Sequence, residues 1–176
     1  KRMNRKTSKE NIEQLIKKIR KEIPDVTLRT SLIVGFPGET DDNFTELLDF
    51  VKLTKFDKLG AFMYSKEDGT PAAKLPQQVH GNTKKARYKK VMEEQEKISN
   101  SILKKKIGNI YNVLVENISF DGKYLIGRTK QDVPEEDGLV YIKNKNYKVE
   151  SLLNNFVTCK IEDVSNYDLM GSVINE

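Results

Sequence analysis

The sequence predicts two architectures in succession: an α/β part with two parallel strands, and then a small all-β barrel. Residues 8–64 alternate between helical and strand patterns, which implies parallel strands joined by a right-handed crossover. Parallel sheets are normally covered on both faces and need more than two strands, so we expect partner strands outside this chain. From about residue 107 the apolar period changes to two and turn residues recur, which is typical of short antiparallel strands.

The α/β part is expected to contain two helices and two strands. A capping box that begins at Thr7 starts an amphipathic helix, and Pro24 stops it. Residues 28–34 are rich in apolar and β-favouring residues and have no polar face beyond the start of the segment, which is typical of a strand buried in a parallel sheet. Thr40 is a good cap for a second helix. A second short apolar strand is expected at residues 59–64.

A long helix and five short strands are expected in the rest of the chain. Residues 83–106 contain neither glycine nor proline and carry a narrow apolar stripe, which predicts a mostly exposed helix. The Asp121-Gly122 pair predicts a hairpin between two alternating strands. Three more strand patterns follow, at residues 139–142, 156–164 and 169–174. Five strands in about 70 residues predict a small closed antiparallel barrel, because closure removes exposed edges.

Composition excludes several kinds of chemistry. The 176 residues include one cysteine and one histidine, so disulfides, a cysteine-ligated cluster, a multi-cysteine zinc site and the usual serine triad are excluded within this chain. Cys159 alternates with apolar neighbours and is expected to be a buried core residue, and His80 is expected in an exposed linker. No apolar run approaches the ~20 residues of a membrane helix, so we expect a cytoplasmic protein without membrane contact.

Charge is unevenly distributed along the chain. Residues 1–22 and 82–106 each carry a net charge of +6, while residues 107–176 carry seven bases and eleven acids. Nucleic-acid binding through phosphates needs a surplus of Lys and Arg, so the acidic balance of the last segment argues against RNA as its partner. The basic run at residues 84–90 is interpreted as the solvated face of a scaffold helix, with ribosomal RNA contact as the alternative.

The strongest local motif follows the first strand. A strand that ends in Gly35-Phe36-Pro37-Gly38 and opens a capped helix places backbone groups and a helix N-terminus at the carboxyl edge of a parallel sheet. Ligands of α/β folds bind at this edge. An ordinary tight turn between strand and helix would carry the same glycines, so spacing alone leaves both interpretations open.

Several motifs together resemble one family over essentially the whole chain. They are Arg29-Thr30, residues 33–40, Phe62, Tyr64-Ser65, residues 69–72, the long helix and the terminal barrel. In this order they are similar to the carboxyl-terminal part of a radical S-adenosylmethionine methylthiotransferase. The barrel resembles a TRAM domain. Residues 127–129 and 132–138 are most similar to the RimO branch, which methylthiolates an aspartate of a small-subunit ribosomal protein, whereas a sister branch modifies adenosine in transfer RNA.

The resemblance implies a fold and a division of the chain. Residues 1–81 would be the last two strands and helices of a partial radical SAM (β/α) barrel, and residues 82–106 a connecting helix that completes it. Residues 107–176 would be a five-stranded antiparallel TRAM barrel. Because the chain begins with Lys1 and holds one cysteine, we expect a piece of a longer enzyme that has no catalytic residue and no metal site of its own.

The same resemblance implies candidate cofactor residues. The whole enzyme would use S-adenosylmethionine and two four-iron four-sulfur clusters. Residues on the cofactor side would be Val34, Gly35, Phe36, Pro37, Gly38 and Glu39, with Arg5 and Arg29 as partners for the cofactor carboxylate or nearby acidic groups. For Arg29, a solvent-facing position or an internal ion pair is the alternative.

Candidate substrate residues lie at a strand end and in the barrel. They are Tyr64, Arg128, Asp132, Glu135, Glu136 and Asp137. An acidic rim suits a basic ribosomal protein, although a solvated loop that only aids solubility is the plain alternative. Tyr64 is more simply a packing residue. A transfer-RNA methylthiotransferase and a stand-alone RNA-binding TRAM module remain alternative functions, and we expect the isolated chain to self-associate through its exposed strands.

Overall fold

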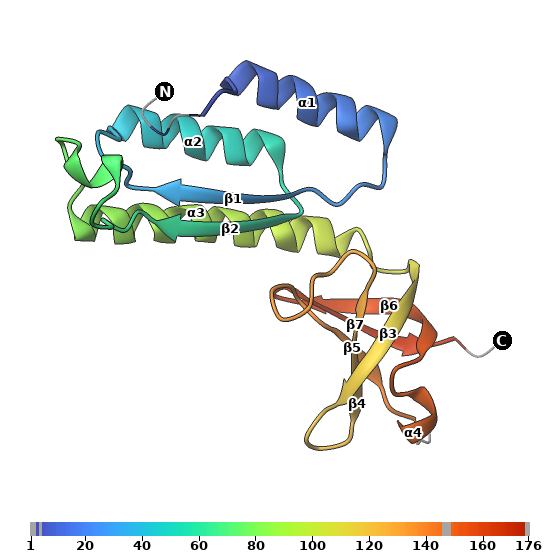
Figure 1. The fold of residues 1–176 in the computed structure, drawn as a ribbon. Coiled ribbons are helices and arrows are strands. Elements are labelled where there is room, and N and C mark those ends of the chain that lie inside the picture. Colours follow the sequence, from blue (N-terminus) through green and yellow to red (C-terminus); the bar gives the residue numbers. More distant parts are fainter. Residues whose placement is uncertain (1–2, 4, 146–148, 175–176) are drawn as a thin grey trace. The chain divides into compact units, whose positions relative to one another are not determined.

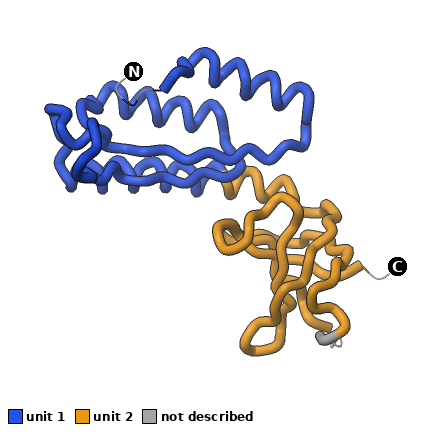
Figure 2. The backbone as a smooth tube through the Cα atoms, in the orientation of Figure 1, with its two compact units in different colours: residues 1–98 blue, residues 99–176 orange. Residues whose placement is uncertain are grey.

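The computed structural model describes residue 3, residues 5–145 and residues 149–174 (Figure 1). The chain divides into two compact units, residues 1–98 and residues 99–176 (Figure 2). Each unit is described by itself below. In the part of the chain that the structure describes, every helix is too short or too polar to cross a bilayer.

The first unit is an α/β arrangement built on two parallel strands. Its elements in chain order are α1 (Lys9–Glu22), β1 (Arg29–Val34), α2 (Asp41–Thr54), β2 (Lys58–Met63), the 3-10 helix η1 (Pro71–Lys74) and α3 (Gly81–Lys104), which runs on into the second unit. Ser8 caps α1 by accepting the N–H of Asn11, one residue later than the predicted cap at Thr7. The predicted parallel pairing is confirmed, with Arg29 opposite Lys58 and Val34 opposite Met63.

The two faces of this sheet differ in cover. Val34, Leu59 and Ala61 are buried, together with Val51 of α2 and Val91 of α3. On the opposite face, Ile33 and Phe62 are direct partners in the ladder, and their side chains are 43% and 59% exposed. Side chains alternate between faces along a strand, so one face carries the core while the other presents apolar groups to solvent.

The second unit is a closed five-stranded barrel with the order β3-β4-β5-β7-β6. Its elements are β3 (Ile110–Ile118), β4 (Tyr124–Thr129), β5 (Val140–Lys143), α4 (Val149–Leu152), β6 (Phe156–Ser165) and β7 (Asp168–Val173). Alternate residues of these strands fill the interior, and the core consists of Leu103, Val113, Val115, Leu125, Val140, Ile142, Val157, Cys159, Ile161 and Leu169. The predicted barrel is therefore confirmed as a closed structure.

One strand pair departs from the predicted antiparallel pattern, because β5 and β7 run parallel. The other four neighbouring pairs are antiparallel. Strands that alternate in direction can close a ring only when their number is even, so a barrel of five must contain a parallel pair. The sheet is mixed for this reason.

A glycine lies where two strands of the barrel wall approach each other closely. A Cβ atom added to Gly127 on β4 would overlap the carbonyl oxygen of Leu114 on β3. Next to this contact, the register of β3 shifts between Val115 and Asn117. Close approach of backbones at a bulge is a common reason for glycine within a strand.

Cys159 provides a chemical probe of the barrel interior. Its side chain is buried, and burial raises the pKa of the thiol to about 11, because a thiolate is disfavoured away from water. We expect the native chain at pH 8 to react with a thiol reagent far more slowly than the chain in denaturant. Measuring the rate of disulfide exchange with an aromatic disulfide in both conditions checks this.

The same shift sets a direction for stability against pH. A raised pKa in the folded state favours folding below the pKa of the unfolded thiol, and this contribution to the free energy of unfolding is lost as pH rises from there toward about 11.

In the thiol-reagent experiment, equal reaction rates of Cys159 in the native and the unfolded chain would show that the thiol is accessible and would contradict its burial.

Candidate functional site

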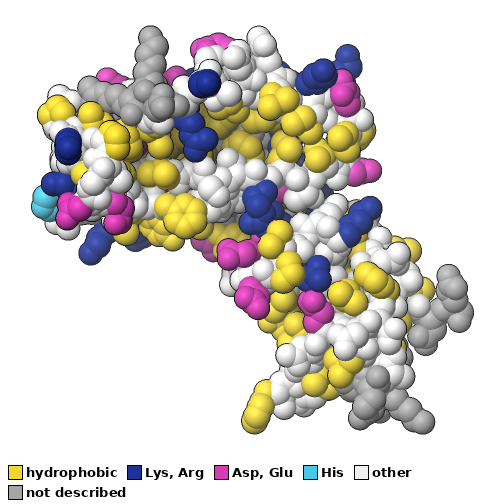
Figure 3. Space-filling view, viewed as in Figure 1, with side chains coloured by type: hydrophobic (Ala, Val, Ile, Leu, Met, Phe, Trp, Pro, Cys, Tyr) yellow, Lys and Arg dark blue, Asp and Glu magenta, His cyan; other side chains and the backbone are white. Residues whose placement is uncertain are grey.

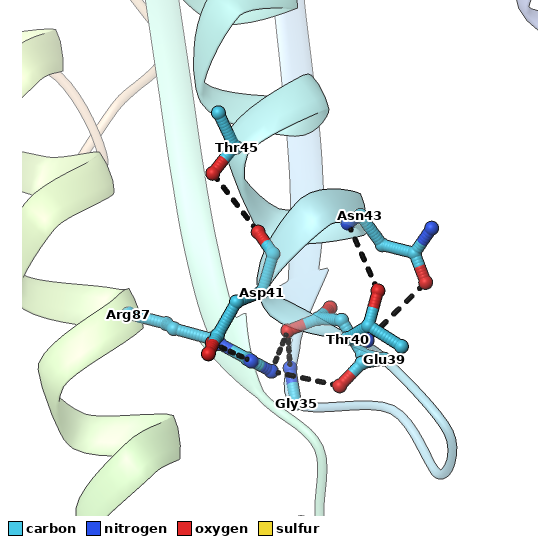
Figure 4. A network of polar contacts seen from close by, with 7 residues as sticks. All are labelled: Gly35, Glu39, Thr40, Asp41, Asn43, Thr45 and Arg87. Carbon is cyan, nitrogen blue, oxygen red and sulfur yellow. Dashed lines mark hydrogen bonds and ion pairs between the residues drawn. The ribbon is translucent and has the colours of Figure 1, made fainter.

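The candidate cofactor rim is the loop between β1 and α2, residues 35–40, which we call the rim loop. Gly35 is the first residue of the loop and has a φ of +74°, a backbone conformation that residues other than glycine rarely adopt. The Thr40 hydroxyl accepts the N–H of Asn43, and the Asn43 side chain accepts the N–H of Thr40, which forms a reciprocal cap for α2 (Figure 4). The predicted cap at Thr40 is confirmed.

A buried carboxylate organises the rim loop from inside. Glu39 turns back so that its Oε1 accepts the N–H of Gly35 at 2.9 Å. The same oxygen lies 2.7 Å from Nη1 of Arg87 on α3, and Nη2 of Arg87 lies 2.7 Å from Oδ1 of Asp41 (Figure 4). The side chain of Arg87 is only 7% exposed and that of Glu39 only 12%. An ion pair so well screened from water is a structural feature of the loop rather than a surface contact.

Most backbone donors of the rim loop are already engaged. Besides Gly35, three of its N–H groups donate to neighbouring acceptors: Gly38 to the Gln77 carbonyl at 2.9 Å, Glu39 to the Phe36 carbonyl at 2.9 Å, and Thr40 to Oδ1 of Asn43 at 3.2 Å. An anion-binding loop needs free N–H groups aimed at its ligand. With four of its N–H groups engaged, the rim loop does not resemble an anion-binding site, and the ring of Phe36 is half-buried.

Tyr64 lies beside the rim loop, directly after β2. Its N–H donates to the Val34 carbonyl at 2.9 Å, and its ring meets that of Phe36 edge to face with centroids 5.2 Å apart. The structure thus brings Tyr64 and Phe36 together, as expected for neighbouring strand ends. The Tyr64 hydroxyl is buried and has no hydrogen-bond partner among the described residues. These contacts favour the packing role that the sequence suggested for Tyr64.

The two candidate arginines are placed away from the rim loop or in the open. Arg29 begins β1, so it lies at the opposite end of a six-residue strand, roughly 20 Å from the loop at about 3.3 Å per residue. Arg5 is exposed and precedes α1. The structure therefore brings the residues from Val34 to Glu39 together with Tyr64 and does not bring Arg29 to them.

Two residues that sequence reasoning missed are Lys84 and Arg87. Both were assigned to the solvated face of a basic helix, yet Arg87 is buried and Lys84 is half-buried. Their spacing gave a usable signal: positions 84, 87, 91, 95 and 98 follow the three- and four-residue steps of one helix face, and the last three carry Val91, Gln95 and Ile98, all buried.

The acidic loop after β4, residues 130–138, separates its carboxylates into two roles. Oδ2 of Asp132 accepts both the N–H and the hydroxyl of Thr129, at 3.1 and 2.6 Å. Oδ2 of Asp137 accepts the N–H of Val133 at 2.8 Å. Asp132 and Asp137 therefore hold the loop in shape, as short acidic side chains commonly do in turns.

The remaining acids of this loop face solvent. Glu135 and Glu136 are exposed, and Glu135 has a φ of +64°. On the neighbouring strand β4, Nε of Arg128 lies 2.9 Å from Oε1 of Glu116 on β3, which balances its charge. Of the predicted substrate residues in the barrel, Glu135 and Glu136 are thus the ones whose negative charges are exposed to solvent.

The comparisons with known proteins agree with this architecture. The family model described as "TRAM domain" matches residues 107–174, which cover all strands of the closed barrel. The barrel is thus similar to a TRAM domain. The α/β unit that precedes it extends the similarity beyond that domain.

Over its whole length, the chain is homologous to the carboxyl-terminal part of RimO proteins. It is 57% identical over 176 residues to "Ribosomal protein uS12 methylthiotransferase RimO" of Alkaliphilus oremlandii. The proteins of the same name from Clostridium perfringens and Clostridioides difficile are 47% and 49% identical over 176 and 175 residues. The chain spans 40% of the length of the first relative and 38% of the other two.

The two roles within the acidic loop lead to different stabilities of the corresponding variants. Asp132→Ala leaves the N–H and hydroxyl of Thr129 without their acceptor, and Thr129 is 2% exposed. We expect the barrel to lose about 1–3 kcal/mol. Glu136→Ala is the matched control and is expected to stay within about 0.5 kcal/mol of the parent chain. Urea unfolding followed on barrel amide resonances measures both, and an equal loss in the two variants would contradict the assignment.

Proposed function

We propose that this chain forms the carboxyl-terminal part of an enzyme that adds a methylthio group to an aspartate of ribosomal protein uS12. The observation that carries the proposal is identity of 47–57% to RimO proteins along the entire chain, in both units. A radical route through S-adenosylmethionine is the chemistry that the family resemblance implies. Such a substrate places the enzyme with ribosomes in the cytoplasm.

The residues of this chain do not fit an iron–sulfur cluster. Such clusters are held by several cysteine thiolates, whereas the sole cysteine, Cys159, is buried in the barrel core. We therefore propose that the ligands of both clusters belong to another part of the enzyme. The chain alone is then inactive as a methylthiotransferase.

The rim loop fits the uncharged part of S-adenosylmethionine better than its charged end. Its N–H groups at Gly35, Gly38 and Glu39 are engaged. A carbonyl oxygen has two lone pairs, so even one that already accepts a hydrogen bond, such as that of Phe36, can accept a second from an exocyclic amine. The half-buried ring of Phe36 adds apolar surface to this loop. We propose this loop as a contact for the adenine base, with Arg5 rather than the distant Arg29 as candidate partner of the carboxylate.

The barrel is proposed as the docking unit for the ribosomal protein. Residues 107–176 carry four more acids than bases, and Glu135 and Glu136 are exposed on the loop after β4. Charge complementarity to a basic protein accelerates encounter and favours the correct partner. The same surplus of acids opposes binding to the phosphates of RNA.

A binding experiment tests the docking proposal. The 176-residue chain is titrated with purified uS12 and, separately, with a transfer-RNA anticodon stem-loop, at low and moderate salt. We expect uS12 to bind, and Glu135→Gln combined with Glu136→Gln to weaken it by about tenfold, or about 1.4 kcal/mol. Glu67→Gln with Asp68→Asn is the matched control, because it removes the same charge from an exposed pair outside the barrel. Binding of the stem-loop alone, with steep salt dependence, would favour a transfer-RNA substrate instead.

We also propose that the isolated chain self-associates through the uncovered face of its sheet. Ile33 and Phe62 are adjacent and exposed on that face, and exposed apolar groups beside open strand edges promote pairing between chains. Sedimentation over a range of concentrations is expected to show dimers or larger species, and Ile33→Ser with Phe62→Ser to reduce them. Leu53→Ser, at an 81% exposed position on α2, is the control. A monomer at every concentration would overturn this proposal.

A further inference from the structure

We infer that Lys84 and Arg87 of α3 are positioning residues that hold the rim loop and the end of β2 in a single conformation. The inference rests on the proposed contact of the rim loop with the cofactor. Neither residue belongs to the loop or to the motifs after the strands. Both reach these segments from a helix that follows them in the chain (Figure 4 shows Arg87).

Lys84 connects the ends of the two strands. Its aliphatic stem occupies the place that a Cβ of Gly35 would take, so the first residue of the rim loop packs directly against it. Its Nζ donates to the Tyr64 carbonyl at 2.8 Å and lies 4.9 Å from the centroid of the Tyr64 ring. One side chain therefore contacts the residue after β1 and the residue after β2.

Arg87 fixes the rim loop through a backbone N–H. Oε1 of Glu39 is shared between Nη1 of Arg87 and the N–H of Gly35, so the guanidinium holds the carboxylate where Gly35 needs its acceptor. Arg87 also donates to the Glu39 carbonyl at 3.2 Å, and its Cζ lies 5.5 Å from the centroid of the Phe44 ring. These contacts hold the guanidinium of Arg87 in one position beside the rim loop.

The consequence of losing Arg87 follows from the burial of Glu39. A carboxylate whose side chain is 12% exposed is costly to keep charged without a partner, so it would turn toward solvent. Gly35 would then lose its acceptor, and the loop would sample several conformations. Preorganisation of a ligand contact would be lost although no ligand-contacting residue had changed.

Hydrogen exchange of the Gly35 amide in the 176-residue chain tests the positioning itself. We expect Arg87→Ala to speed this exchange by about tenfold or more, since a charge-assisted hydrogen bond is lost. Arg87→Lys restores part of the protection, because an ammonium can pair with Glu39. Glu39→Gln retains an oxygen acceptor for Gly35 and is expected to have a smaller effect than Glu39→Ala. Lys85→Met, at an exposed neighbouring position, is the control.

For Lys84, two variants separate the stem from the charge. Lys84→Met keeps an aliphatic chain against Gly35 and removes the donor to Tyr64. Lys84→Ala removes both. We expect exchange at Gly35 to rise clearly only in Lys84→Ala, whereas both variants loosen the segment around Tyr64. Unchanged exchange at Gly35 in folded Arg87→Ala and Lys84→Ala would overturn the positioning role.

Kinetics of the full-length enzyme test whether the positioned rim loop contributes to cofactor binding. If the rim loop contacts the cofactor, Arg87→Ala raises KM for S-adenosylmethionine several-fold, with a smaller change in kcat, and Arg87→Lys recovers most of it. A merely destabilised enzyme would lose active molecules, which lowers kcat at constant KM. Faster exchange at Gly35 together with an unchanged KM would overturn the cofactor contact while leaving the positioning of the loop established.

Discussion

The ion pair between Glu39 and Arg87 is the interaction on which the first unit depends at the carboxyl edge of its sheet. It joins the short loop between β1 and α2 to the first turns of α3, 48 positions further along the chain. A buried pair of this kind stabilises weakly overall but is costly to break from one side, so it selects one loop conformation. Figure 3 shows the side chains that lie on one face of the molecular surface. The side chains of Arg87 and Glu39, in contrast, are only 7% and 12% exposed.

Acidic side chains in the barrel illustrate how similar residues can perform different tasks within one loop. Asp132 and Asp137 accept backbone N–H groups and thereby define the turn, which leaves Glu135 and Glu136 facing water. In this loop the short side chains of the two aspartates reach the backbone of their own turn, while the longer side chains of the two glutamates are exposed. The aspartates, which are shorter by one methylene group, thus shape the loop, and the glutamates carry its surface charge.

Periodicity and capping predicted the strands and the cap at Thr40, because these features depend on residues close in sequence. The parallel pair and the closed barrel were then predicted from general rules for chain connections and strand edges. The parallel pair β5–β7 was not predicted, although strand number alone requires it once the barrel is closed. The burial of Arg87 was not predicted, because a charged residue in a basic run is usually solvated and its partner Glu39 lies 48 positions away in the sequence. The four-residue helix α4 has too few residues to show a helical period.

The parallel pair also bears on how the barrel assembles. β5 and β7 cannot be joined by a short turn, so the chain must pass through α4 and the whole of β6 before β7 can take its place beside β5. β3 and β6 likewise pair across the two intervening strands, β4 and β5. Contacts of such long sequence separation form slowly, because the chain between them must be ordered first. Closure of the barrel therefore depends on its last strand, and a ribosome that is still synthesising β7 carries an open sheet.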